Sequence, residues 1–275
     1  MRGCACRGTA GFAHVSCLAE QAKILFQEAE ENNLDMGSRW ERWYACSLCE
    51  QDYHGVVFCA LGWACWKTYL GRPETDQVQW MAMTVLGNSL SSARRDEDAL
   101  AVREAELSLQ RRVGASEISN LVSQSNLAAT YQRLGRLEKA SSMQRDVYSG
   151  YLKIMGEEHS QTLSAANNYA NSLVGIDRFE EAKALLRKVT PLARRALGEG
   201  NSTTLRLTWI YAQSLYRNPG ATLDDRREAV TTLEDAARIA RRVLGGAHPT
   251  TEEMEDDLRD ARALLRARET PSTSA

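Results

Sequence analysis

The sequence predicts a mainly α-helical protein, in which a solenoid of stacked helix pairs follows a small N-terminal module that binds metal. The first supporting observation is a repeat, since Gly114, Gly156 and Gly198 recur with a 42-residue period. A fixed period of this size is typical of solenoids, in which each repeat supplies one small group of helices. The second observation is that all seven cysteines lie between Cys4 and Cys65. Such confinement is typical of a metal module and not of small hydrophobes spread through a core.

Length, composition and charge are those of an ordinary globular protein. The chain has 275 residues, of which 43% are hydrophobic and 25% charged, and its formal net charge is −2. This charge argues against a nucleic-acid partner. The longest apolar run, Val56–Trp66, is too short to span a membrane, and the first residues do not form a secretory signal. We therefore expect a cytoplasmic or nuclear protein, in which paired cysteines more often hold metal than form disulfides.

The N-terminal segment, residues 1–52, contains three closely spaced pairs of cysteine or histidine residues, which commonly bind metal ions. These pairs are Cys4/Cys6, His14/Cys17 and Cys46/Cys49. Zinc takes four thiolate or imidazole ligands in a tetrahedron, and Cys-x-Cys or Cys-x-x-Cys supplies two of them from one tight turn. The pattern therefore predicts zinc as a cofactor.

The order and spacing of these pairs resemble the RING-CH (RING-variant) zinc finger, in which seven residues separate Cys-x-Cys from His-x-x-Cys, as they do here. The resemblance implies a cross-braced finger, with Cys4, Cys6, Cys46 and Cys49 on one zinc. His14 and Cys17 would be half of a second site. The family's finger begins with a further Cys-x-x-Cys that does not precede Cys4. Either the sequence begins inside a longer working protein, which we expect, or the second site is absent.

Several residues around the finger have two interpretations. His54, Cys59 and Cys65 could replace the missing ligands, but the apolar run around the two cysteines favours packing. A plant-homeodomain finger fits less well, because Trp43 lies three residues before Cys46 where that family has two. We expect a helix over Leu18–Glu31. We also expect Trp40 and Trp43 to form a small core around the metal.

Beyond an apolar connector over residues 53–79, the chain repeats. The segment Asn126–Tyr131 realigns on Asn168–Leu173 and on Tyr211–Leu215. In the second unit, helix A is expected near Ile118–Leu134 and helix B near Leu137–Met155, with Gly135 in the turn between them.

The text Asn-Leu-Ala-Ala-Thr-Tyr-Gln-Arg-Leu-Gly-Arg-Leu-Glu-Lys-Ala resembles a tetratricopeptide repeat, and the long period resembles the kinesin-light-chain type. That type joins repeats through Leu-Gly-x-x-His-Pro-x-Thr, which is similar to Leu244–Thr251 here. We therefore expect His159 and His248 to serve in linker packing and capping. The expected fold is a tetratricopeptide-type α-solenoid over residues 80–268, with about four units and a capping helix over Glu252–Arg268. A disordered tail is expected over residues 269–275.

The resemblance implies that helix A of each unit faces a groove that holds a partner peptide. Asn126 and Asn168 occupy equivalent positions in successive units, and Gln124 and Asn171 lie near them. These amides either contact the peptide or serve as solvated and interhelical polar groups, and the repetition fits both interpretations.

Two functions follow from the sequence. The first is a zinc-binding interaction scaffold that acts as a ubiquitin-ligase-like adaptor. Its finger would dock a ubiquitin-conjugating enzyme, its repeats would hold the substrate, and it would have no nucleophile of its own. The alternative is a non-catalytic tetratricopeptide scaffold with a degenerate finger. No phosphate loop, Gly-x-Ser-x-Gly or His-Glu-x-x-His motif supports other chemistry.

Overall fold

The computed structural model describes residues 14–269, and these residues are helical apart from their turns and one isolated antiparallel bridge between Ala45 and Asp52. The chain divides into two compact units, Met1–Arg136 and Leu137–Ala275, each of which is described by itself. Among the described residues, no helix combines the length and apolarity that a membrane crossing requires.

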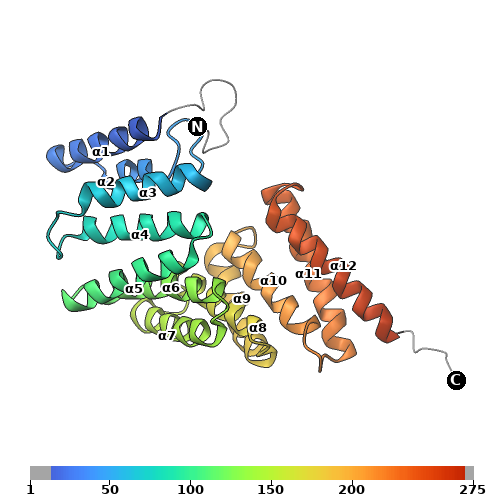
Figure 1. The fold of residues 1–275 in the computed structure, drawn as a ribbon. Coiled ribbons are helices and arrows are strands. Elements are labelled where there is room, and N and C mark those ends of the chain that lie inside the picture. Colours follow the sequence, from blue (N-terminus) through green and yellow to red (C-terminus); the bar gives the residue numbers. More distant parts are fainter. Residues whose placement is uncertain (1–13, 270–275) are drawn as a thin grey trace. The chain divides into compact units, whose positions relative to one another are not determined.

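The first unit contains six α-helices and one 3-10 turn in its described part. In chain order they are α1 (Val15–Asn32), α2 (Met36–Trp40), η1 (Glu41–Trp43), α3 (Gly55–Tyr69), α4 (Gln77–Ser92), α5 (Asp96–Arg112) and α6 (Glu117–Arg133). Helix α1 packs on α3, and α3, α4, α5 and α6 then pack each on the next (Figure 1). The helix expected over Leu18–Glu31 is therefore present and slightly longer.

Residues 53–79, expected as a connector, contain α3, which packs between α1 and α4. The close approach of α3 to α4 depends on Gly62. A Cβ at that position would lie only 2.1 Å from Oγ of Ser89 on α4, whereas the bare glycine lets the two backbones approach. Helix α3 is apolar on most faces, and it buries Val57, Leu61 and Cys65 while Val56 and Trp63 stay exposed.

Trp40 and Trp43 belong to an aromatic cluster with Phe26 and Tyr69. Tyr69 contacts the other three rings at centroid separations of 5.4 to 5.9 Å. These large apolar side chains pack against α1 and α3, where burial of their surface stabilises the unit. The two tryptophans thus belong to a small core, as expected, and their place around a metal stays a prediction.

The second unit consists of six helices in its described part. They are α7 (Leu137–Met155), α8 (Ser160–Gly175), α9 (Phe179–Leu197), α10 (Ser202–Tyr216), α11 (Leu223–Leu244) and α12 (Pro249–Glu269). Each packs on the next in chain order, and its core is rich in leucine and alanine. Helix α12 covers the place where a capping helix was expected over Glu252–Arg268. Of the expected disordered tail, residues 270–275 lie outside the described part.

The turns between repeats follow the sequence pattern. Gly156 and Gly198 each follow the end of a helix with positive φ, the backbone conformation that glycine adopts readily after a helix. The Nδ1 atom of His159 accepts a hydrogen bond from the amide of Gln161, and His248 does the same for Thr250, both at 3.2 Å. The capping role expected of these two histidines is thus confirmed.

Candidate functional site

The predicted zinc ligands that the structure describes form two local pairs. His14 precedes α1 and Cys17 lies in its first, exposed turn, with Nδ1 of His14 3.9 Å from Sγ of Cys17. Zinc bonds of about 2.0 and 2.3 Å at a tetrahedral angle would hold such a nitrogen and sulfur about 3.5 Å apart. This pair therefore has nearly the spacing of two ligands of one metal.

Cys46 and Cys49 lie in a tight turn. The amide of Cys46 donates to the carbonyl of Gln51, and the amide of Glu50 donates to the carbonyl of Cys46, both at 2.9 Å. The amide of Leu48 lies 3.5 Å from Sγ of Cys46, which it can reach as a donor. Such a donor stabilises a thiolate, the form that binds metal. The turn is thus compatible with a half-site.

The two pairs do not combine into a full site. Within residues 14–269, no group of three or more His, Cys, Asp or Glu side chains is gathered so that it could hold a metal ion. Cys4 and Cys6 lie outside the described residues. The structure therefore shows no RING-CH finger, and the four-cysteine set predicted from the sequence stays a prediction.

The residues suggested as substitute zinc ligands, His54, Cys59 and Cys65, lie in other surroundings in the structure. Cys65 is fully buried in the aromatic cluster, and burial raises the pKa of its thiol well above the ordinary value. Cys59 packs against Leu86 and Leu90, and His54 is exposed before α3. The packing interpretation of the two cysteines is therefore confirmed.

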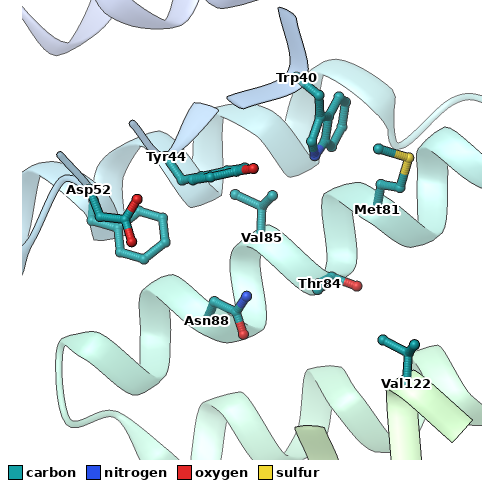
Figure 2. Close-up of a pocket in the computed structure, with 9 residues that line it drawn as sticks. Trp40, Tyr44, Asp52, Met81, Thr84, Val85, Asn88 and Val122 are labelled. Carbon is teal, nitrogen blue, oxygen red and sulfur yellow. The ribbon is translucent and has the colours of Figure 1, made fainter. Parts of the chain in front are cut away.

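A hollow in the first unit has a volume of about 620 Å³. Three parts of the chain line it: the segment before α3 together with α3 itself, helix α4, and one residue of α6 (Figure 2). The lining residues are Trp40, Tyr44, Asp52, Phe58, Met81, Thr84, Val85, Asn88 and Val122. Six of these nine are apolar or aromatic without a charge, so the hollow combines an apolar surface with a few polar groups, as binding pockets do.

The α4 residues that face the hollow lie on one side of the helix. Met81, Thr84, Val85 and Asn88 recur at the three- and four-residue spacing of a single helical face. Asp52 is exposed, and none of the salt bridges among residues 14–269 includes it. Burial raises the pKa of Tyr44, and the charges of Glu41 and Asp52 raise it further. The carboxylate of Asp52 is therefore an available negative charge beside an aromatic ring.

A buried polar network lies beneath this face. Glu106 on α5 is 1% exposed, and its Oε1 accepts hydrogen bonds from the hydroxyls of Thr84 at 2.6 Å and Ser123 at 3.1 Å. Its Oε2 has no hydrogen-bond partner among the described residues. Burial raises the pKa of Glu106, although these hydrogen bonds and the charge of Arg103 oppose the shift.

Arg103 connects the network to the hollow. Its guanidinium donates to Oδ1 of Asn88 at 2.8 Å, to Oγ1 of Thr130 at 2.5 Å and to the backbone carbonyl of Asn126. Burial lowers its pKa to about 10, so it is charged at neutral pH. Gly87 leaves room for it, because a Cβ there would lie 3.1 Å from Nε of Arg103.

The amides predicted for the groove are distributed over both units. Gln124 and Asn126 are half-buried on α6 but do not line the hollow, and Asn126 contributes its carbonyl to Arg103. On α8, Oδ1 of Asn168 accepts from Nδ2 of Asn167 at 3.2 Å, and Asn171 is exposed. The peptide role of these four amides stays a prediction.

Sequence reasoning missed Asn88, the amide that does line the hollow. Asn88 precedes Asn171 by close to two repeat periods. The repeat therefore contained a signal for it, because Asn171 was already a candidate.

Comparison with known proteins identifies the repeats. Residues 120–195 match the tetratricopeptide repeat family. No curated protein matches the sequence. The chain is similar to the crystal structure of a putative kinesin light chain from Podosopora anserina, with nearly identical tetratricopeptide-like repeats. The TM-score is 0.55 at 20% identity, over 84% of this chain and 98% of that one.

Two further structures show the same architecture. BtubC (BKLC) from P. vanneervenii is similar with a TM-score of 0.54 and 16% identity, over 96% of this chain and 97% of that one. The apo form of RapI is similar with a TM-score of 0.54 and 12% identity, over 90% of this chain and 85% of that one. At these identities the likeness establishes the fold alone. The chain is a mainly α-helical, tetratricopeptide-type solenoid with kinesin-light-chain-like structural neighbours.

Proposed function

We propose that this protein is a non-catalytic interaction scaffold that holds an extended segment of a protein partner in the hollow of its first unit. The observation that carries the proposal is the hollow itself, whose 620 Å³ lie against helices α4 and α6. This volume is within the range of about 300–1,000 Å³ typical of ligand pockets. Each of these two helices is the first helix of its repeat pair. The first helix of each pair is the one expected to face a peptide.

The apolar lining supplies the anchoring that a peptide needs. Binding energy at interfaces concentrates in a few large side chains that fill pockets and exclude water. The hollow is such a pocket, and its apolar lining includes Trp40, Phe58 and Met81. Val122 on α6 is 40% exposed and adds accessible apolar surface. The tetratricopeptide match, which includes Val122, supports partner binding by the repeats.

The proposal is tested by adding a charge to the hollow. Peptides selected from a random phage-displayed library on the wild-type protein are synthesised, and their dissociation constants are measured by fluorescence anisotropy. Val122→Lys is expected to weaken binding by about tenfold or more, because it places a charge on apolar contact surface. Val243→Lys is the matched control, since Val243 is 50% exposed on α11 and outside the hollow. Equal affinity of the two variants would contradict the proposal.

A second proposal concerns zinc. We propose that the turn over Cys46 and Cys49 is half of a zinc site, completed by Cys4 and Cys6 as the sequence pattern implies. The Leu48 amide close to Sγ of Cys46 and the soft thiolate donors support it. When bound, the metal would supply folding stability to the N-terminal segment.

Native mass spectrometry of protein expressed in zinc-supplemented medium tests this proposal. One zinc per chain is expected for the wild type, none for Cys46→Ser, and one for the control Cys59→Ser. Wild-type protein that is free of zinc and as thermally stable as Cys46→Ser would contradict it.

The ubiquitin-ligase role depends on that zinc site and on a surface for a ubiquitin-conjugating enzyme. We propose it only as a consequence of zinc binding. Its test is self-ubiquitination in a purified system with activating and conjugating enzymes, with Cys46→Ser as the control. Equal activity of the two proteins, including none in either, would rule out a zinc-dependent ligase role.

A further inference from the structure

The hollow of the first unit has two chemically different ends. Figure 2 shows Asp52 and Tyr44 toward one side of the view, and Met81 and Val122 toward the other. One end therefore carries a carboxylate and an aromatic ring, whereas the other carries flexible and branched apolar side chains together with the ring of Trp40, which Figure 2 shows beside Met81. A ligand that matches both ends must itself be divided in this way.

The end around Asp52 suits a cation. The carboxylate is exposed and has no salt bridge with the described residues, and the rings of Tyr44 and Phe58 line the same hollow. A lysine or arginine side chain between them gains an ion pair with the carboxylate and a cation–π interaction with an aromatic face. The aromatic walls also cover the aliphatic stem of such a side chain.

The opposite end suits a large apolar side chain. Met81 is half-buried on α4 and adapts its shape through its unbranched chain. Val85 forms the buried floor beside it, and Val122 faces it from α6. No charged side chain lines this end among the described residues, so an apolar group can lose its water there without leaving a charge unpaired.

The orientation of Asn88 is fixed by Arg103. A guanidinium has five N–H donors and no acceptor, so only Oδ1 of Asn88 can face it. Both hydrogens of Nδ2 are therefore left for a ligand. Figure 2 shows that nitrogen directed toward Val85 and the interior of the hollow, with the oxygen directed away. The amide is thus a donor aimed at an acceptor in the ligand, such as a peptide carbonyl.

From this geometry we propose that the hollow recognises a peptide in which a lysine or arginine and a large apolar residue flank a backbone carbonyl. The basic side chain contacts Asp52, the apolar side chain lies against Met81 and Val122, and the carbonyl accepts from Asn88. Arg103 is a positioning residue, since it acts on the ligand through Asn88. This inference rests on the proposed function and specifies its ligand.

The first test is the composition of the selected peptides. Phage selection on the whole 275-residue chain is expected to enrich sequences that combine Lys or Arg with a large apolar residue. Selected peptides without this basic preference that still lose affinity for Val122→Lys would overturn this inference and leave the proposed function standing. Selected peptides that bind Val122→Lys and wild type equally would overturn both.

The second test is a charge exchange at Asp52. Asp52→Asn is expected to weaken the selected basic peptide about 3- to 5-fold, the effect of losing an exposed ion pair. Asp52→Lys is expected to bind the selected basic peptide about tenfold or more weakly than wild type does. The same variant should bind a version of the peptide in which Glu replaces the basic residue more tightly than it binds the original peptide. Glu28→Lys, an exposed change of equal charge on α1, is the control. If Asp52→Lys and Glu28→Lys change the affinity for the basic peptide equally, the assignment of Asp52 as the contact of the basic side chain would be overturned.

The third test separates the donor role of Asn88 from its contact with Arg103. Asn88→Asp keeps an oxygen for Arg103 but removes both donors. It also adds a negative charge, which by itself would strengthen binding of a basic peptide. A dissociation constant that is larger by about 5-fold, as expected for a lost hydrogen bond, therefore supports the donor role. Unchanged or stronger binding would overturn it.

Discussion

Each of the two units buries one carboxylate in its described part, and the two are held in different ways. Asp257 on α12 is 7% exposed and accepts hydrogen bonds at both oxygens. Oδ2 accepts from Trp209 and Gln213 at 2.5 and 2.6 Å, and Oδ1 accepts from Tyr216 and Arg217 at 2.6 and 3.1 Å. Burial alone would raise its pKa, but these hydrogen bonds and the charge of Arg217 lower it.

Glu106, in contrast, has two donors on one oxygen and no partner in the described chain for the other, so burial raises its pKa. A fully satisfied buried carboxylate stabilises the elements that surround it, whereas a half-satisfied one costs free energy. Asp257 joins the capping helix to the last repeat pair. Glu106 lies under the hollow and orients Thr84. The two buried carboxylates therefore differ: both oxygens of Asp257 are hydrogen-bonded, whereas only one oxygen of Glu106, the carboxylate under the hollow, has hydrogen-bond partners among the described residues.

The largest expected effect is at Asp257. Asp257→Ala leaves the buried donors of Trp209, Gln213 and Tyr216 without an acceptor, and we expect a loss of about 3 kcal/mol of unfolding free energy. Urea unfolding followed by far-ultraviolet circular dichroism measures it, and hydrogen exchange locates it in α10 and α12. Asp256→Ala is the control, because Asp256 is exposed and pairs only with Arg259. A loss no larger than that of the control would contradict the role of Asp257.

The second effect is at the closest helix contact of the first unit. Gly62→Ala places a Cβ against Ser89, and we expect it to cost about 2 kcal/mol as overpacking. In a Ser89→Gly background the same substitution should no longer destabilise. Gly175→Ala is the control, because nothing lies within 4 Å of the added Cβ, and it should be neutral or slightly stabilising. The idea fails if Gly62→Ala behaves as the control does.

The repeats of the second unit were largely predictable because their signals are local. Gly156 and Gly198 specify helix ends through backbone conformation at one residue. His159 caps a helix by accepting from an amide two residues away. Such interactions depend on neighbours in the sequence, so a pattern that recurs with a fixed period indicates them directly.

The first unit was less predictable because its packing depends on residues far apart in the sequence. The run Val56–Trp66 lies in α3, where Val57, Leu61 and Cys65 are buried and Val56 and Trp63 are exposed. Nothing in the run shows that Gly62 meets Ser89, or that Trp40 and Trp43 meet Phe26. Arg103 likewise reaches Asn126 across 23 residues. The hollow arises from these distant contacts, so a local signal such as cysteine spacing does not indicate it.

The third prediction is that acid affects the two carboxylates in opposite directions. The pKa of Asp257 is below its ordinary value of 3.8, so the unfolded chain binds more protons. Its stabilisation is present above that value and is lost as pH falls below it. The pKa of Glu106 is above its ordinary value of 4.5, so the folded chain binds more protons, and its contribution becomes less favourable as pH rises through this region.

Urea unfolding across the acidic range, compared for wild type, Asp257→Asn and Glu106→Gln, separates these contributions. Asp257→Asn should destabilise most at neutral pH, with a difference from wild type that shrinks in acid. Glu106→Gln should gain on wild type as pH rises from about 4.5 toward neutrality. Parallel pH profiles for the two variants would remove the distinction between the units.

The smallest effect concerns the repeat linkers of the second unit. His159 and Asn201 occupy equivalent positions one repeat period apart. They cap α8 and α10 in the same way, through Nδ1 at 3.2 Å and Oδ1 at 2.8 Å. Asn is among the strongest N-caps, so His159→Asn should stabilise by about 0.5 kcal/mol and Asn201→His should destabilise by a similar amount. Thermal unfolding of both variants measures the pair. If both exchanges destabilise, each side chain is fitted to its own linker as well as to its cap, and the second unit is less regular than its period indicates.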